Sequence, residues 1–362
     1  MIMSYHDIIM ATRPIARNQV KNCRQQRNWS QAELARHAGI SRSEVSAIEV
    51  SGLVPSVVAA LSLSRALGRT VEELFGSRAG DGTSPKWAWP PTHTPCRYWQ
   101  ATVQGAELRF PAEALPAGVL AHDGIFQSGR FAPREDADPR TTLVLASCDP
   151  AVALLAAEYA RATGFRMVPL ARSSRQALAL LGQGLVHVAG VHFSTREEPD
   201  GNLRSVQEVL GSGYSLVRVA GWQEGLAFGY GSRISSVSGA MRAKLRWIGR
   251  EPGSAARQCL DALLPNHPPP RRIAHNHQAV VEAVRCGWAE VGVCHRLVSE
   301  EAGLRFVPVR EENFDLCYSA VEEGDPRIAG LLRVIRSSSY RRLVGELPGY
   351  DTAQAGELSQ TV

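Results

Sequence analysis

The stretch from Ser30 to Gly52 reads S-Q-A-E-L-A-R-H-A-G-I-S-R-S-E-V-S-A-I-E-V-S-G and decides how the first part of this chain folds. Ser30 is followed three residues later by Glu33, the spacing of a capping box that satisfies free N–H groups in the first turn of a helix. A first helix is therefore expected over about 31–38. Gly39 then supplies the permissive backbone that a tight turn requires. A second helix follows the turn, so the stretch predicts a helix-turn-helix.

The second helix of this motif begins after Ser41, a good N-cap, and runs through Val50. Apolar residues recur at helical spacing in both helices, which predicts a small shared core. These core residues are Leu34, Ala35, Ile40, Val45 and Ile48. Polar side chains that could reach DNA are left on the outer faces. They are Gln31, Arg42, Ser43 and Ser46.

Residues 15–75 resemble the phage-repressor and Cro-like (XRE-type) DNA-binding domain. The motifs that carry this resemblance are S-Q-x-E-L-A, G-I-S-R-S, I-E and V-E-E-L-F, and the domain is expected over 13–76. In that family the second helix of the motif lies in the major groove of double-stranded DNA, and the glutamine that opens the first helix contacts phosphate. The resemblance implies base contacts by Ser41, Arg42, Ser43 and Ser46, and backbone contacts by Gln31 and Arg24.

Glu44 departs from an ideal DNA-reading helix. Its carboxylate can accept a hydrogen bond from a cytosine amino group, but it also repels phosphate. The preferred DNA sequence therefore does not follow from these residues. A helical hairpin used for protein contact is the alternative interpretation of the motif.

The composition of the chain suits a nucleic-acid partner without requiring one. The 362 residues carry a formal net charge of +5, and the basic excess is concentrated between Arg13 and Arg42. Seven scattered cysteines without a C-x-x-C pair argue against a disulfide framework. No run approaches the ~18 apolar residues of a membrane span, and the first ten residues lack the features of a signal peptide. A cytoplasmic protein without a membrane partner is expected.

Between about 77 and 140 the pattern predicts a linker with a small β connection rather than a folded domain. The segment begins with S-R-A-G-D-G-T-S-P, which is typical of a linker. Residues 98–110 alternate as a hairpin does, with Gly105 near the turn. Three tryptophans are unusual for a free linker, and we expect them to dock against a domain or a dimer partner rather than stack on nucleic-acid bases. They are Trp87, Trp89 and Trp99.

From 141 to about 356 short apolar strands alternate with helices, which predicts a parallel sheet flanked by helices. Strands are expected at 142–147, 165–169, 186–191, 214–219, 226–230, 245–249, 290–293, 305–309 and 315–319. Helices are expected at 150–161, 175–181, 253–264, 278–286, 327–336 and 340–347. Roughly 220 residues of this alternation are large for one sheet and fit two lobes.

Candidate ligand-binding residues follow the ends of several predicted strands. In open α/β sheets, ligands lie beyond the carboxyl ends of the strands, where helix N-termini present free N–H groups. The candidates are Ser147, Cys148, Asp149, Ser173, Ser174, His192, Arg250, Gly253, Ser254 and Arg257. The serines and Asp149 can also be simple helix caps, and His192 can be a core histidine bonded to backbone.

The same residues resemble a periplasmic-binding-protein-like domain of the molybdate-binding-like type. The resemblance is carried by S-C-D-P-A-V-A-L-L-A, V-A-G-V-H-F, W-I-G-R-E-P-G-S-A-A-R and G-Y-D-T-A-Q-A-G-E. It implies a two-lobed α/β domain (type II) with two chain crossings, and a small ligand between the lobes, such as the oxyanions molybdate or tungstate. The fold class is thus multidomain, with an all-α helix-turn-helix head and a two-lobed α/β domain over 141–356.

The chain departs from that family at two positions in the expected cleft. Cys148 stands where a histidine is common, and Ala255 stands where a threonine is common. Two carboxylates, Asp149 and Glu251, also lie close to the candidate residues. If either faces the cleft, a neutral or cationic organic ligand becomes the better expectation.

Other chemistry is less well supported by the residues. Cys148 and His192 lie at the ends of neighbouring predicted strands and could form a thiolate–imidazole pair, but no third, orienting residue is evident. Residue types that can bind a metal occur at His275, His277, Cys286, Cys294 and His295, but their spacing matches no zinc-binding pattern. No catalytic residue, metal site or cofactor is expected.

These patterns together indicate a one-component, ligand-responsive transcriptional regulator. Its expected partners are double-stranded DNA, a small-molecule or oxyanion effector and a second copy of the chain, because such heads usually bind DNA as dimers. The alternative is a cofactor-handling protein or enzyme of molybdenum-cofactor metabolism whose helical head tethers it to DNA or to a partner.

Overall fold

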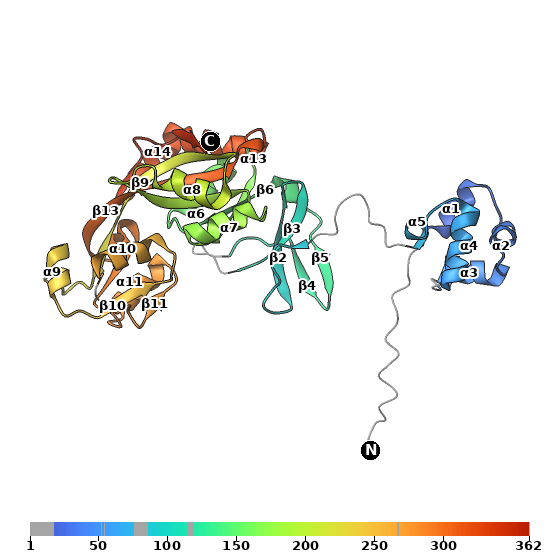
Figure 1. Cartoon of the computed structure of the whole chain (residues 1–362), viewed down its shortest axis with the longest axis horizontal. Coiled ribbons are helices and arrows are strands. Elements are labelled where there is room, and N and C mark those ends of the chain that lie inside the picture. Colours follow the sequence, from blue (N-terminus) through green and yellow to red (C-terminus); the bar gives the residue numbers. More distant parts are fainter. Residues whose placement is uncertain are drawn as a thin grey trace, which may run out of the picture. The chain divides into compact units, whose positions relative to one another are not determined.

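A computed structural model describes residues 18–51, 53, 55–75, 86–113, 119–265 and 268–361. The chain divides into two compact units, Met1–Ser84 and Pro85–Val362, which are described separately (Figure 1). The expected N-terminal tail, Arg13 itself, the end of the first domain at Gly76 and the first part of the expected linker lie outside the described residues.

The first unit is helical, as the sequence predicts. Its helices are α1 (Val20–Gln26), α2 (Gln31–Ala38), α3 (Arg42–Ser51), α4 (Val57–Leu67) and α5 (Val71–Phe75). The capping box is present: the Glu33 N–H donates to Ser30 Oγ at 3.2 Å, and the Ser30 N–H donates to Glu33 Oε2 at 2.6 Å. Gly39 has a φ of 66°, the left-handed conformation that ends α2 and allows the turn.

The core of the first unit contains the residues expected from helical spacing. Four of them are buried, and Ile40 is half-buried against the same cluster. Helices α1, α4 and α5 complete the core, whose other buried members are Val20, Ala38, Leu63, Leu67 and Leu74. The motif is thus stabilised by packing as well as by its caps.

The second unit begins with a five-stranded sheet in the order β1-β3-β2-β4-β5. The strands are β1 (Lys86–Trp87), β2 (Cys96–Val103), β3 (Ala106–Pro111), β4 (Gly124–Gln127) and β5 (Arg130–Pro133). The predicted hairpin is β2 and β3, joined through Gln104 and Gly105, both with positive φ. This sheet is more extensive than the expected β connection.

The three tryptophans of this region pack within their own unit. Trp99 is buried in a cluster shared with the larger sheet, and its indole N–H donates to the Ala121 carbonyl at 3.1 Å. Trp87 contacts other aromatic rings of the five-stranded sheet, and Trp89 lies edge-on to Phe110. Trp89 and Trp99 therefore pack in the cluster shared with the larger sheet, whereas Trp87 packs on the five-stranded sheet itself.

The rest of the second unit is built on a larger mixed sheet in the order β11-β10-β12-β9-β13-β8-β6-β7. Its strands are β6 (Thr142–Ser147), β7 (Arg166–Ala171), β8 (Val188–Thr195), β9 (Tyr214–Phe228), β10 (Trp247–Arg250), β11 (Ile273–Ala274), β12 (Val291–His295) and β13 (Arg305–Ser319). Two short strands also pair with β9, namely β14 (Tyr350–Asp351) and β15 (Leu358–Gln360).

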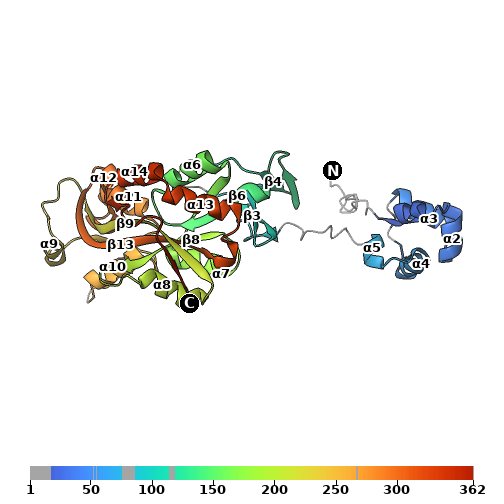
Figure 2. The same ribbon diagram turned by 90° about the horizontal axis from the view of Figure 1, so that it is seen from above.

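Helices cover both faces of this sheet (Figure 2). They are α6 (Val152–Thr163), α7 (Ser174–Gly182), α8 (Gly201–Leu210), α9 (Val237–Arg242), α10 (Ala255–Leu263), α11 (His277–Arg285), α12 (Arg296–Glu301), α13 (Pro326–Arg336) and α14 (Ser338–Gly345), with short 3-10 turns at Pro139–Thr141 and Ala320–Glu322. The sequence patterns missed α8, α9 and α12.

Two long antiparallel strands, β9 and β13, connect the two lobes of this domain. They pair from Tyr214 with Ser319 at one end to Phe228 with Arg305 at the other. We call the part with β6–β8, α6–α8, α13 and α14 the first lobe, and the part with β10–β12 and α9–α12 the second lobe. The prediction of separate strands at 214–219, 226–230, 305–309 and 315–319 was wrong, because each pair is one continuous strand. Polar residues at their centres had interrupted the apolar pattern.

Each lobe has an apolar cluster on both faces of its part of the sheet. In the first lobe, α6, α13 and α14 cover one cluster, and α7, α8 and the five-stranded sheet cover the other. In the second lobe, α11 and α12 cover one cluster, and α9 and α10 cover the other. The seven cysteines are free thiols. Among the described residues no helix is long and apolar enough to cross a membrane.

Candidate ligand site and candidate DNA-binding face

The start of α3 presents polar side chains to solvent. Ser41, Arg42 and Ser43 are exposed, and Ser46 is half-buried one turn later. Ser41 Oγ accepts from the Glu44 N–H at 3.1 Å and lies 2.9 Å from Ser43 Oγ, so Ser41 acts as the cap of α3. The Arg42 side chain extends from the first position of the helix, where a base-reading side chain is expected.

Arg24 and Gln31 have partners inside the first unit. The Arg24 guanidinium donates to both Glu49 carboxylate oxygens, at 2.7 and 2.9 Å, and to the Trp29 carbonyl at 2.6 Å. Gln31 Nε2 donates to the same Glu49 carboxylate at 3.0 Å. These bonds connect α1 and α2 to α3, and the phosphate contacts expected of both residues stay predictions.

The first lobe brings Ser147, Cys148 and Asp149, at the end of β6 and in the loop after it, together with His192, which lies inside β8 rather than beyond its end. Ser147 and Asp149 serve mainly to shape this loop. Ser147 Oγ accepts from the Asp149 N–H at 3.0 Å, and Asp149 Oδ1 accepts from the Ala151 N–H at 2.9 Å. Tyr350 also donates its hydroxyl to Asp149 at 2.6 Å. Burial raises the pKa of the Asp149 carboxyl, and these hydrogen bonds oppose that rise.

Cys148 and His192 form the contact that their sequence positions suggested. Cys148 Sγ lies 3.0 Å from His192 Nε2, and the other ring nitrogen, Nδ1, lies 2.7 Å from Glu312 Oε2. Trp222 donates its indole N–H to the same carboxylate oxygen at 3.0 Å. Glu312 is thus the orienting residue that the sequence did not reveal.

The chain of polar contacts continues from Glu312 into the second lobe. Arg310 forms an ion pair with Glu312, and its Nη2 lies 2.9 Å from Glu224 Oε2. The same nitrogen donates to the carbonyl of Ala255, the first residue of α10, at 2.9 Å. The contacts therefore run from Cys148 in the first lobe, across β13 and β9, to α10 in the second lobe.

The protonation states of the side chains in this series of polar contacts depend on one another. Burial lowers the pKa of His192, but the charges and hydrogen bonds of Cys148 and Glu312 outweigh burial and raise it well above its usual value. Burial opposes ionisation of Glu312 too, yet His192 and Arg310 hold its pKa far below the usual range. Burial and the charge of Glu312 raise the pKa of Glu224 to about 8. An imidazolium beside an ionised Glu312 and a protonated Glu224 is the state that follows near neutral pH.

The second-lobe candidates surround the start of α10. Ser254 is the N-cap, and its Oγ accepts from the Arg257 N–H at 3.2 Å. Arg250 is buried, and its guanidinium donates to both Glu251 oxygens, at 3.0 and 3.2 Å, and to His277 at 3.3 Å. Arg257 pairs with Asp261 at 2.8 Å. Both arginines are thus already paired with carboxylates.

The two lobes approach each other where α7 and α10 begin. Gly253 has a φ of +86°, and a Cβ added there would lie 3.3 Å from Cδ of Arg175 in α7. Ser173 caps α7, and the neighbouring Ser174 is 1% exposed. Ser174 Oγ has no hydrogen-bond partner among the described residues. The serine candidates of the two lobes therefore lie near the same gap.

Several residues of this region were missed by the sequence patterns. Trp222 and Glu224 lie in the middle of β9, and Arg310 and Glu312 lie in the middle of β13. In the sequence they stand in the stretches W-Q-E and R-E-E, whose charged residues interrupt apolar runs. Their burial was visible only from the pairing of the two strands.

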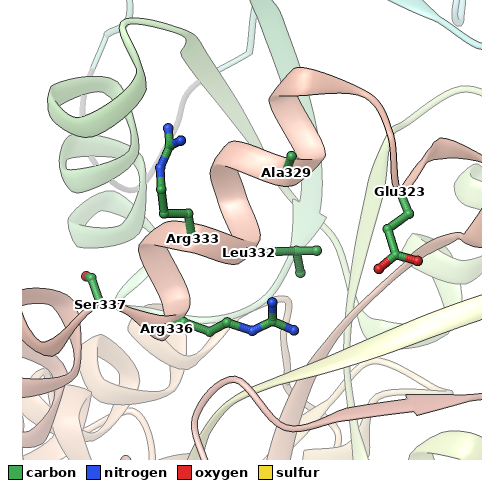
Figure 3. Close-up of a pocket in the computed structure, with 6 residues that line it drawn as sticks. All are labelled: Glu323, Ala329, Leu332, Arg333, Arg336 and Ser337. Carbon is green, nitrogen blue, oxygen red and sulfur yellow. The ribbon is translucent and has the colours of Figure 1, made fainter.

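Two cavities of the second unit lie away from these serines. One, of 440 Å³, is lined by residues of β9, β13 and β14, by Arg296 of α12, by Gly349 and by the exposed Arg196. The other, of 540 Å³, lies along the outer face of α13 between Glu323 and Ser337 (Figure 3). Arg333 and Arg336 project from that helix. Among the described residues no group of three or more His, Cys, Asp or Glu side chains is arranged to hold a metal.

Comparison with known proteins supports both parts of this description. Residues 20–74 match a model described as helix-turn-helix, and residues 156–336 match a model described as a PBP superfamily domain. The uncharacterized protein YvgK of Bacillus subtilis (strain 168) is 25% identical over 197 residues, which is 52% of this chain. The chain covers 63% of the length of that relative.

Solved structures of binding proteins are also similar to this chain. PhnD1 from Prochlorococcus marinus (MIT 9301), in complex with methylphosphonate, is 12% identical with a TM-score of 0.42, covering 61% of this chain and 92% of PhnD1. An ABC-type phosphate transport receptor from Vibrio cholerae is 11% identical with a TM-score of 0.41, covering 57% of this chain and 97% of the receptor. From the two family matches, the chain belongs to the PBP superfamily and carries an XRE-type helix-turn-helix domain at its N-terminal end.

Proposed function

We propose that this protein is a ligand-responsive, DNA-binding transcriptional regulator that works in the cytoplasm as a homodimer. The observation that carries the proposal is the presence, in one chain, of a helix-turn-helix with an exposed α3 start and a two-lobed domain connected by β9 and β13. A ligand that binds better to one arrangement of the lobes shifts the population toward it. In the proposed regulator this shift changes the separation of two DNA-binding heads, which read half-sites about one helical turn apart.

The proposed ligand site is the gap between the starts of α7 and α10. Helix N-termini present free N–H groups that favour anions, and Ser174 adds a buried hydroxyl that lacks a partner among the described residues. A small tetrahedral oxyanion, with molybdate as the first to test, is the proposed class. Arg250 and Arg257 are each paired with a carboxylate, so the helix N–H groups and the Ser174 hydroxyl are the donors proposed to hold the anion.

The DNA-binding part is tested by Arg42→Ala in the full chain. The target is the sequence that the wild-type protein selects from a random DNA pool, and affinity is measured at several salt concentrations. We expect a loss of about 1–3 kcal/mol with relaxed sequence preference, because Arg42 is placed to contact a base edge. Arg65→Ala removes the same charge from an exposed position of α4 and is the control. Equal effects of the two substitutions would contradict base reading by Arg42.

The ligand part is tested by calorimetric titration of the full chain with molybdate, tungstate, sulfate and phosphate. We expect one of these anions to bind and Ser174→Ala to weaken that binding, because the substitution removes the unpaired hydroxyl. Ser235→Ala changes an exposed serine and serves as the control. No heat with any anion would remove the oxyanion class and leave DNA binding by the head unaffected.

A further inference from the structure

Cys148, His192 and Glu312 form a linear arrangement whose chemistry the proposed regulator does not use. The three side chains come from the loop after β6, from β8 and from β13. Cys148 is half-buried, whereas His192 and Glu312 are buried. The Sγ–Nε2 distance is 3.0 Å and the Nδ1–Oε2 distance is 2.7 Å. A nucleophile, a base and a group that orients the base are thus present in the required order.

The geometry determines what each group does. Glu312 accepts the Nδ1–H bond, which orients the ring with Nε2 toward Cys148. When the ring is protonated, Nε2–H donates to the sulfur, and a hydrogen bond to the charged form favours the thiolate. The thiolate is the nucleophilic form of cysteine. His192 and Glu312 are therefore positioning residues for the sulfur.

The environment of His192 includes further titratable groups, which come from the surrounding strands and loops and from the start of α11. The His192 ring interacts electrostatically with Cys148, Asp149, Glu224, His277, His295 and Glu312. Burial, with neighbouring positive charge, lowers the pKa values of His277 and His295, the latter to about 3. Both rings therefore stay neutral, and the imidazolium charge belongs to His192.

The other cysteines lack this arrangement. Cys96 donates to a backbone carbonyl, and Cys294 lies 3.6 Å from the carbonyl oxygen of His277 rather than from its ring. Cys286 is exposed at the end of α11. In the described part of the chain, Cys148 is the cysteine whose sulfur contacts an imidazole. Cys286 therefore provides an internal control for accessibility without a histidine.

We propose that Cys148 is a nucleophilic thiol and a site of covalent modification by small electrophiles that enter between the lobes. In the reaction the sulfur lone pair forms a bond to the electrophilic atom, and the leaving group departs with the electron pair of the bond that breaks. With iodoacetamide the new bond is S–C and the leaving group is iodide. The adduct removes the hydrogen bond between Cys148 Sγ and His192 Nε2. This bond is the first in the series of polar contacts that runs through β13 to the second lobe.

The test measures labelling of the full-length protein by iodoacetamide, with each cysteine followed by mass spectrometry of its peptide. We expect Cys148 to react about tenfold faster than Cys286 at pH 7, despite its lower exposure, because a hydrogen bond from the imidazole favours the nucleophilic thiolate.

Two variants distinguish the nucleophilicity of the Cys148 sulfur from its accessibility to the reagent. Glu312→Gln keeps the shape of the side chain but loses its charge, and we expect it to slow the labelling of Cys148 several-fold while the labelling of Cys286 stays unchanged. His192→Asn tests the same contact directly, and circular dichroism of both variants checks the fold. A wild-type Cys148 that reacts no faster than Cys286, or a Glu312→Gln variant whose Cys148 is labelled at the wild-type rate, would overturn the proposal. This outcome is independent of DNA binding and of oxyanion binding.

Discussion

Glu224 and Glu312 lie on neighbouring strands and share one guanidinium, that of Arg310. Two carboxylates so close in a buried site cannot both ionise without a large cost, so one retains its proton. Glu312 has the imidazolium of His192 as a second partner, which favours ionisation of Glu312 and protonation of Glu224. The arrangement places a proton in the middle of the two strands that connect the lobes.

The protonated Glu224 predicts a pH dependence of stability. Its pKa in the folded protein is about 8, above the usual carboxyl value. The stabilisation is therefore fully present below about pH 4.5 and is lost as the pH rises toward 8, by at most about 1.4 kcal/mol per pH unit. Glu224→Gln mimics the protonated form, so its melting temperature should rise relative to wild type between pH 5 and 8.

Thermal unfolding at pH 5, 6.5 and 8 measures this difference, at about 2–4 °C per kcal/mol for a large domain. Glu346→Gln removes an exposed carboxylate and provides the control. A difference between Glu224→Gln and wild type that stays constant with pH would show that Glu224 is ionised throughout.

At the scale of elements, Glu49 of α3 acts as a common acceptor for α1 and α2. Its carboxylate is 1% exposed and accepts from Arg24 of α1 and from Gln31 of α2. Burial opposes ionisation of Glu49, but these partners lower its pKa overall. The orientation of α3, the helix proposed to read DNA, therefore depends on one buried acceptor together with the apolar core.

Arg24→Ala should destabilise the helix-turn-helix, because it leaves a buried carboxylate without its main partner. We expect a loss of about 1–3 kcal/mol, measured as a lower melting temperature of the first unit. Arg36→Ala, at an exposed position of α2, is the matched control. Unchanged stability of the Arg24 variant would contradict this role.

The same variant tests the predicted phosphate contact of Arg24. Each phosphate contact adds about 0.9 to the slope of log affinity against log salt concentration. A slope reduced by that amount in Arg24→Ala would mean that Arg24 leaves Glu49 and contacts the DNA backbone in the complex. An unchanged slope would limit Arg24 to positioning α3.

At the scale of the whole molecule, the five-stranded sheet belongs physically to the two-lobed domain. Trp99, Phe110 and other residues of β2 and β3 share a buried cluster with β6–β8 and α7. Polar bonds strengthen the contact: His187 Nε2 lies 2.8 Å from the Thr102 carbonyl oxygen, and Arg327 donates to the same oxygen at 2.8 Å. This agrees with the compact unit that begins at Pro85.

Truncation at two positions checks this organisation. A chain of 85–362 keeps the shared cluster, and we expect it to unfold cooperatively near the temperature of the second unit in the full protein. A chain of 141–362 loses Trp99 and Phe110, whose burial contributes about 1.5–3 kcal/mol each, and should be strongly destabilised or aggregate. Equal melting temperatures for the two chains would show that the sheet is a separate connection, as the sequence had suggested.

The sequence by itself determined the features that depend on neighbouring residues. The capping box of α2, the glycine turn before α3 and the β2–β3 hairpin with Gly105 were all predicted, because caps and turns depend on side chains within a few residues. The alternation of strands and helices likewise indicated a two-lobed α/β domain. The end of its first strand indicated where Cys148 lies, whereas His192 lies inside β8, a longer strand than expected.

Only the tertiary structure decided the partners that lie far apart in the chain. His192 and Glu312 are 120 residues apart, and Cys148 and Tyr350 reach the same region from opposite ends of the domain. A charged residue in the middle of a strand looks like a loop residue unless the opposite charge that stabilises its burial is known. For Glu224, Arg310 and Glu312 that charge comes from the neighbouring strand, so local patterns could identify neither the two continuous strands nor the buried polar chain between the lobes.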